Sequence, residues 1–419
     1  MGYLRKEPAQ KSASKVAQKK STKSRDPFLL GIMGIVALSG IVTVLVDYQF
    51  KMIASDTFPD EGDLVAFFGT FLVMPSVIKL AIKKRFLVEG GGRNAHEGFT
   101  PNVGGMAIFT GLLLSNQYLL FYFFDSFQNF EISSQFEIQI KSYILITAGT
   151  IVMFVMGLLD DISGLSSYFR FFVQVIIAFT LAYIGDLRID NFYGVLGLYE
   201  IPYYFSIIFS VSVMIFIINS FNLTDGLDGL AASLGLFILS CFAIIFYTNG
   251  KYFDCVLACA GISSLFAFWL YNRPPARIFM GDGGSLVIGF IIACCAIRAC
   301  SMSIEPVGVK NPVFILCILA YPAIDTIRVF SVRVLSGRSP FSADRNHIHH
   351  LLIDKDFNHG WASFFAVMYC ASLTLICFLL IENPNLSFFI MVTLAILFIV
   401  LPMASFARST TKKFLSLFK

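Results

Sequence analysis

Charged residues are scarce in this sequence. They make up 14% of the 419 residues, whereas hydrophobic residues make up 57%, and the mean hydropathy is +0.75. A soluble chain of this length with that composition would expose large apolar patches, so a soluble globular protein is excluded and a chain embedded in lipid is indicated. The small net charge of +4 gives no reason to expect a nucleic-acid partner.

Two familiar cofactor patterns are also missing. The nine cysteines fall within apolar stretches and form no C-x-x-C motif, which argues against a disulfide framework and against a cysteine metal site. The G-x-x-x-x-G-K-S/T pattern of P-loop nucleotide-binding proteins is absent as well. Any phosphate chemistry must therefore depend on other residues.

Long apolar runs are what the sequence has in abundance. A run of about 20 apolar residues spans the hydrocarbon core of a bilayer, and about twelve such runs occur here. Backbone polar groups cannot stay unpaired in hydrocarbon, so each run is predicted to be a helix and the fold class to be all-α. The runs cover approximately 28–46, 64–81, 103–124, 142–159, 169–183, 203–218, 230–247, 253–271, 285–300, 313–329, 362–381 and 386–406.

Lysine and arginine are unevenly distributed between the segments that join these runs. Most lie in the N-terminal tail and in alternate connections, which predicts a polytopic membrane protein with both termini in the cytoplasm. The expected division is a basic disordered tail over 1–26, an extra transmembrane helix over 27–50, a main transmembrane domain over 63–406 and a basic tail over 407–419.

Acidic and amide residues gather in the connections that are predicted to be cytoplasmic. Asp160 and Asp161 end the fourth run, where the helix macrodipole disfavours carboxylates. The segment NLTDGLDGL places Asn222, Asp225 and Asp228 at i, i+3 and i+6, on one side of a helix start. Helix caps and solvated loop acids are the alternative interpretation. A divalent cation between carboxylates and phosphate would offset the repulsion.

Two further connections carry groups suited to phosphate. In FMGDGGS, Asp282 stands among Gly281, Gly283 and Gly284, so backbone N–H groups can form an anion nest, although a tight turn alone would also explain the glycines. In GRSPFSADRNHIHH, an arginine and three histidines supply donors for a diphosphate. A zinc site is the alternative there, but no cysteine lies nearby. These residues are Arg345, His347, His349 and His350, whereas the lone His359 is expected to be structural or on the surface.

The carboxylates, together with this arginine and histidine segment, predict a metal and phosphate site at one face of the membrane. Phosphoryl transfer requires charge neutralisation and positioning above all, and these residue types supply both. A transporter for phosphate-bearing lipids is the rival class. Transporters usually place ionisable residues near the bilayer midplane, whereas the acids here lie at predicted helix ends.

The motifs GLLDD, NLTDGLDGLA, PPARIFMGDGGS and SPFSADRNHIHH resemble those of the polyprenyl-phosphate N-acetylhexosamine-1-phosphate transferases, which form glycosyltransferase family 4. Together with the stretch LRIDNFYGVLGLYEIP, the last motif is similar to the WecA/TagO-like branch rather than to the MraY branch. The resemblance implies transfer of N-acetylhexosamine 1-phosphate, with GlcNAc as the expected sugar, from a UDP-sugar to polyprenyl (undecaprenyl) phosphate. The products would be UMP and the first lipid-linked intermediate of a cell-envelope glycan.

The resemblance also implies roles for individual residues and partners. Asp160, Asp161 and Asp282 would be catalytic, and Asp161 and Asp282 would bind Mg²⁺, with Mn²⁺ as a substitute. The implied partners are UDP-N-acetylhexosamine, undecaprenyl phosphate and the bilayer of the inner (plasma) membrane, with a homodimer left open. The implied substrate-binding residues are Asn222, Asp225, Asp228, Arg345, His347, His349, His350, Arg93, His96 and Gly283.

Three positions depart from the family pattern. Tyr168 and Asn94 stand where the family often has lysine, and Gly164 replaces a common acidic residue. An inactive family member is the alternative that these departures support. Within the enzyme interpretation, the alternative is an MraY-like phospho-N-acetylmuramoyl-pentapeptide transferase.

Overall fold

The computed structural model describes residues 61–89, 99–127, 134–305, 307–338 and 347–398. The described chain is helical apart from one two-stranded antiparallel sheet of β1 (Leu87–Glu89) and β2 (Phe99–Pro101), which confirms the all-α prediction. The helices are α3 (Glu61–Lys84), α4 (Gly105–Phe127), α5 (Ser134–Ser163), α6 (Ser167–Tyr183), α7 (Tyr203–Asn222), α8 (Leu230–Thr248), α9 (Tyr252–Asn272), α10 (Asp282–Ala299), α11 (Pro312–Ile318), α12 (Ala320–Leu335), α13 (Ile348–Ile353) and α14 (His359–Leu379).

Among the described residues, seven helices are long and apolar enough to cross a membrane, or eight if α11 and α12 count as one bent span. Helices α6 and Pro384–Phe398 are apolar but shorter. A multi-pass membrane protein is therefore confirmed, whereas the count of twelve spans stays a prediction. The run over 28–46, the two terminal tails and hence the location of both termini lie outside the described residues.

Local sequence explains where several helices begin and bend. The Ser166 side chain accepts a hydrogen bond from the Phe169 N–H at the start of α6, and Asn358 caps α14 in the same way through the Trp361 N–H. Helices α11 and α12 meet at an angle of 79°. Pro322 stands in the first turn of α12 and has no N–H to donate to the Ile318 carbonyl, so a straight helix cannot continue through this point.

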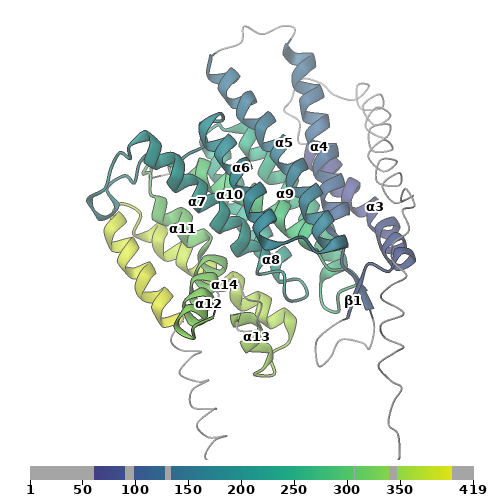
Figure 1. Cartoon of the computed structure of the whole chain (residues 1–419). Helices are drawn as coiled ribbons and strands as arrows, with labels where there is room; N and C mark the ends of the chain where they lie inside the picture. The colour runs from purple at the N-terminus through teal and green to yellow at the C-terminus, as the bar shows by residue number, and fades with distance from the viewer. Residues whose placement is uncertain (1–60, 90–98, 128–133, 306, 339–346, 399–419) are drawn as a thin grey trace, which may run out of the picture. The chain divides into compact units, whose positions relative to one another are not determined.

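Helix α10 lies at the centre of the described bundle, with α4, α5, α7, α8 and α9 packed around it (Figure 1). Its spanning window is 89% buried, whereas that of the peripheral α3 is 28% buried. Small residues along α10 let its neighbours pack closely around it: a Cβ atom on Gly289, for example, would lie 2.9 Å from the carbonyl oxygen of Ile218 on α7. The N-terminus of α10, which carries Asp282, therefore meets the ends of its neighbours.

Glycines allow the closest of these helix contacts. A Cβ atom on Gly105 at the start of α4 would lie 2.1 Å from the backbone nitrogen of Gly284. A Cβ atom on Gly157 in α5 would lie 2.4 Å from the carbonyl oxygen of Asp282. Only hydrogen fits at both positions, so α4 and α5 approach the first turn of α10 at backbone distance.

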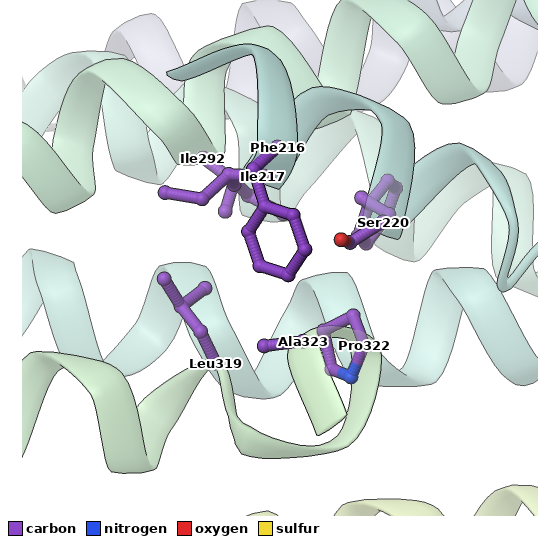
Figure 2. Close-up of a pocket in the computed structure, with 8 residues that line it drawn as sticks. Phe216, Ile217, Ser220, Ile292, Leu319, Pro322 and Ala323 are labelled. Carbon is purple, nitrogen blue, oxygen red and sulfur yellow. The ribbon is translucent and has the colours of Figure 1, made fainter. Parts of the chain in front are cut away.

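A small apolar pocket lies beside the α11–α12 bend, between α7, α10 and α12 (Figure 2). Phe216, Ile292 and Pro322 are among its lining residues, and the Ser220 hydroxyl is the polar group drawn there. No titratable side chain lines this pocket. The acidic and histidine residues predicted from the sequence are therefore not among those that line it.

Candidate active site

Four helix ends bring the predicted acidic residues together. Asp160 and Asp161 lie in the last turn of α5, Asn222 ends α7, and Asp282 begins α10. Arg170, one turn into α6, joins them because the short turn between α5 and α6 folds this helix back onto the same site. Residues separated by more than one hundred positions in the sequence are thus in direct contact.

Asp161 caps the central helix. Its Oδ1 accepts a hydrogen bond of 2.8 Å from the Asp282 N–H, and its Oδ2 accepts one of 2.8 Å from the Gly283 N–H. Asn102, which follows β2, donates to the same carboxylate at 3.3 Å. A carboxylate at a helix N-terminus accepts hydrogen bonds from otherwise unpaired N–H groups and is attracted to the positive end of the helix macrodipole. In the described structure, the N–H groups predicted to form an anion nest therefore hold Asp161.

Arg170 connects the two remaining carboxylates of this group. Its Nη1 atom lies 2.5 Å from Asp160 Oδ2 and 3.1 Å from Asp282 Oδ2. The Leu165 N–H donates a second hydrogen bond of 2.5 Å to Asp160. The Asp160 side chain is only 7% exposed, whereas that of Asp282 is 31% exposed. Asp282 is therefore the carboxylate of this pair that a ligand can reach more readily.

Asn222 fixes the other oxygen of Asp282. Its Nδ2 donates hydrogen bonds of 2.7 Å to Asp282 Oδ1 and of 2.7 Å to Ser285 Oγ. The serine hydroxyl in turn donates to the Gly281 carbonyl at 3.0 Å. These bonds hold the Asp282 side chain in one orientation between α7 and α6. Gly281 itself has a φ of +72°, and a Cβ there would lie 2.7 Å from Asp161 Oδ2, so glycine is required.

The turn between α7 and α8 adds two more carboxylates. The pKa of Asp225 is raised to about 7, mainly by burial and also by the negative charges of Asp282 and Asp228, although a backbone hydrogen bond from Gly281 lowers it in part. Asp228 accepts a hydrogen bond of 3.1 Å from the Ala276 N–H. In the described contacts, Arg170 is the cation paired directly with this cluster at Asp160 and Asp282, so the cluster holds more negative than positive charge.

The histidine segment lies against this acidic turn. A Cβ on Gly226 would lie 2.7 Å from His349 Nε2 and 3.5 Å from His350 Nε2, so both rings border the turn. His349 is 1% exposed, and neither of its ring nitrogens has a hydrogen-bond partner among the described residues. The pKa of His349 is lowered to about 3, mainly by burial and also by the neighbouring His350, so this ring is neutral at pH 7.

His347 stands one step further from the acids. Its Nδ1 lies 2.8 Å from Asp325 Oδ2 on α12, and its ring stacks on that of His349 with centroids 5.4 Å apart. Of the other predicted site residues, Arg93, His96 and Arg345 lie outside the described residues. The roles assigned to all of these residues stay predictions.

The structure also places residues in or beside the site that the sequence interpretation did not include. Arg170 was not among the predicted site residues; it lies two residues after Tyr168, which is 87% exposed and stands in the first turn of α6. His359 Nδ1 lies 3.4 Å from Asp228 Oδ2 rather than apart from the site. Asn102 and Asp325 carried no motif signal, and Ser285 lies in the motif FMGDGGS but was given no role. Their spacing in the sequence says nothing about the helix packing that brings them here.

The donor set is suited to a hard cation. Carboxylate oxygens are the ligands that Mg²⁺ prefers, and it usually takes only one or two of them together with substrate phosphates. Among the described residues, no three His, Cys, Asp or Glu side chains already form a metal-binding group. The partly exposed Asp282 and the excess negative charge around it fit a site completed by phosphate oxygens.

Comparison with known proteins shows the family of this chain. The family model described as glycosyl transferase family 4 matches residues 143–300, the segment from α5 to α10. The chain is 30% identical over 306 residues to a "Probable undecaprenyl-phosphate N-acetylglucosaminyl 1-phosphate transferase" of Bacillus subtilis (strain 168), covering 71% of this chain and 77% of the relative.

Two further relatives carry the same printed name. An "Undecaprenyl-phosphate alpha-N-acetylglucosaminyl 1-phosphate transferase" of Yersinia pestis is 30% identical over 306 residues, covering 71% of this chain and 78% of the relative. The protein of the same name from Escherichia coli (strain K12) is 28% identical over 304 residues, covering 70% of this chain and 77% of the relative. The matched segment contains Asp160, Asp161, Arg170, Asn222 and Asp282. This multi-pass membrane protein therefore belongs to glycosyl transferase family 4.

Proposed function

We propose that this protein transfers GlcNAc 1-phosphate from UDP-GlcNAc to undecaprenyl phosphate, giving undecaprenyl-diphosphate-GlcNAc and UMP. The observation that carries the proposal is the convergence of Asp160, Asp161, Asn222 and Asp282 around the N-terminus of α10. The printed names of the relatives support the lipid acceptor and the sugar. The positive-inside pattern supports a cytoplasmic site in the inner membrane.

The reaction exchanges one diphosphate bond for another. A phosphate oxygen of the lipid forms a bond to the phosphorus that carries the sugar, and the bond from that phosphorus to the oxygen of UMP breaks. The protein must hold two anionic groups in line and close together. Bound Mg²⁺ would neutralise phosphate charge, with Asp282 and Asp161 as the residues proposed to hold it.

The chain's own residues then have separable tasks. Asp282 presents a carboxylate oriented by Asn222 toward the open side of the site. Arg170 places a guanidinium beside Asp160 and Asp282, where it can bind a phosphate through charge-assisted hydrogen bonds. Asp160 restrains that guanidinium and is the group proposed to accept a proton from the lipid phosphate. His349 and His350 border the turn proposed to hold the nucleotide.

The test is release of UMP by purified protein supplied with Mg²⁺, undecaprenyl phosphate and UDP-GlcNAc. A parallel reaction with UDP-N-acetylmuramoyl-pentapeptide checks the MraY-like alternative, and UDP-GalNAc checks the sugar epimer. We expect UMP and lipid-linked GlcNAc in equal amounts. No release from any UDP-sugar, in a preparation that is folded and binds Mg²⁺, would overturn the proposal.

A further inference from the structure

Asp325 is a buried carboxylate that the proposed chemistry does not use. It lies on α12, is 2% exposed, and is three residues before Arg328, with which it forms an ion pair of 2.8 Å. Removing a charge from water is costly unless hydrogen bonds or ion pairs offset the cost, and Asp325 makes several such contacts. What distinguishes it from an ordinary buried ion pair is that, in the described contacts, its other hydrogen-bond partners are His347 and Ile348, which belong to the histidine segment.

Both oxygens of Asp325 are engaged. Oδ1 accepts from Arg328 Nη2 at 2.8 Å and from the Ile348 N–H, the first N–H of α13, at 3.1 Å. Oδ2 lies 2.8 Å from His347 Nδ1. The carboxylate therefore fixes the start of α13 through the backbone and the ring of His347 through its side chain. Helix α13 has only six residues, too few to define its own position without such a tie.

The contact continues from Asp325 to the acidic turn. His347 is 5% exposed and stacks on His349 with an interplanar angle of 13°, and His349 Nε2 faces Gly226 with no room for a Cβ between them. The rings of His349 and His350 have centroids 4.5 Å apart. A change in the His347 ring would therefore displace both histidines that border the turn of Asp225 and Asp228.

We infer that Asp325 is a positioning residue, which holds His347 with Nδ1 protonated and thereby sets the histidine segment against the turn that binds the donor. This inference rests on the proposed function for its meaning in turnover. An ionised carboxylate accepts hydrogen bonds only, so the His347 nitrogen that faces it must donate. The other nitrogen, Nε2, is then directed away from Asp325. A carboxylate behind a functional histidine commonly sets its tautomer and orientation in this way.

The chain offers a matched control for a buried Asp–Arg pair. Asp254 on α9 lies 3.5 Å from Arg298 on α10, with side chains 15% and 20% exposed, and has no histidine partner in the described contacts. Asp325→Asn keeps the size of the side chain but removes the charge that requires a donor at His347. Asp254→Asn removes a partly buried carboxylate that pairs with an arginine but, in the described contacts, with no histidine.

The first measurement is nitrogen-15 NMR of histidine-labelled protein in nanodiscs, with the His347 signal identified by its loss in His347→Ala. We expect a protonated Nδ1 in the unmodified protein and in Asp254→Asn, and a changed signal in Asp325→Asn. Asp325→Glu retains the charge and should restore the Nδ1 signal at least in part, and it replaces the asparagine variant if that protein does not fold. An unchanged signal in Asp325→Asn would overturn the inference.

The second measurement is turnover. We expect Asp325→Asn to lower kcat about 10- to 100-fold, the effect typical of losing a carboxylate that orients a functional histidine, with the KM for lipid phosphate changed less than about 2-fold. His347→Ala combined with Asp325→Asn should be no slower than His347→Ala alone. Losses that multiply would overturn the inference. If the unmodified protein transfers no sugar phosphate, the proposed function fails, whereas the NMR result still decides the pairing.

Discussion

The two ends of α10 carry opposite charges and differ in how those charges are paired. At the N-terminus, Asp282 and the capping Asp161 lie among further carboxylates, with Arg170 as their paired cation in the described structure. At the C-terminus, Arg298 pairs with Asp254 and donates a hydrogen bond of 2.5 Å to Ser142. The macrodipole favours both arrangements. Among the described residues, only the charges at the C-terminus are balanced by protein partners, and this difference fits the proposal that a ligand completes the N-terminal site.

The largest effect is expected from Asp282. Asp282→Asn should lower kcat about 100- to 1000-fold, because it removes a preorganised charge from the reacting phosphates. Asp254→Asn at the other end should leave kcat within about 2-fold and affect thermal stability instead. UMP release and the melting temperature, measured on both variants, separate these outcomes. Near-normal turnover in Asp282→Asn would place the chemistry elsewhere.

The second-largest effect on activity is expected from Arg170. Arg170→Gln leaves Asp160 and Asp282 without their shared cation, and we expect kcat/KM to fall about 10- to 100-fold, the loss of one charge-assisted contact of about 1.5–3 kcal/mol. Arg170→Lys should recover part of this, because lysine supplies the charge but not the planar fork. Arg188→Gln, which removes an ion pair with Asp186 in the 184–202 connection, serves as the control. Equal losses in Arg170→Gln and Arg188→Gln would contradict the assignment.

Addition of Mg²⁺ tests whether the excess negative charge at the N-terminus of α10 binds a cation. Because a ligand that binds only the folded protein stabilises it, saturating Mg²⁺ should raise the melting temperature, with about 2.7 kcal/mol expected at one hundred times the dissociation constant. Asp282→Asn should abolish the shift, whereas Asp254→Asn should retain it. A shift that persists in Asp282→Asn would show that the cation binds outside this cluster.

The smallest effect concerns pH. The pKa of Asp225 in the folded protein, about 7, lies above its ordinary value, so the folded chain binds this proton more tightly than the unfolded chain. Its stabilising contribution is complete at low pH and is lost as the pH rises through about 7. Without metal, Asp225→Asn should therefore show a smaller decline in melting temperature between pH 5 and 8 than the unmodified protein. An identical decline in both would remove Asp225 as the cause.

The sequence predicted much of this organisation, and the reasons are physical. Apolar runs identified the described helices because backbone groups in lipid must bond internally. Asp160, Asp161, Asn222 and Asp282 were found because polar residues are few in such a chain and each falls at a helix end. The run over 169–183 predicted the short α6 to within two residues, whereas the bend before α12 was not evident, because hydropathy does not record how a helix is supported by its neighbours.

Contacts between distant segments were beyond the sequence interpretation. Nothing in the run that contains Asp325 indicates that its carboxylate meets His347, because the pairing depends on how α12 and α13 are placed. The same is true of His359, whose partner Asp228 lies more than one hundred residues away. Gly283 was expected to contact phosphate, and its N–H in fact donates to Asp161, which is visible only once α5 and α10 are side by side.

The close approach at Gly157 makes the position of the Asp282 carboxylate sensitive to a residue that bears no charge. One methyl group there would press on the Asp282 carbonyl and displace the first turn of α10. Mutations that change the spacing between helix backbones should therefore be tolerated as poorly as mutations of the acidic residues. We expect Gly157→Ala to lower turnover as the loss of a carboxylate would, although all the carboxylates are still present.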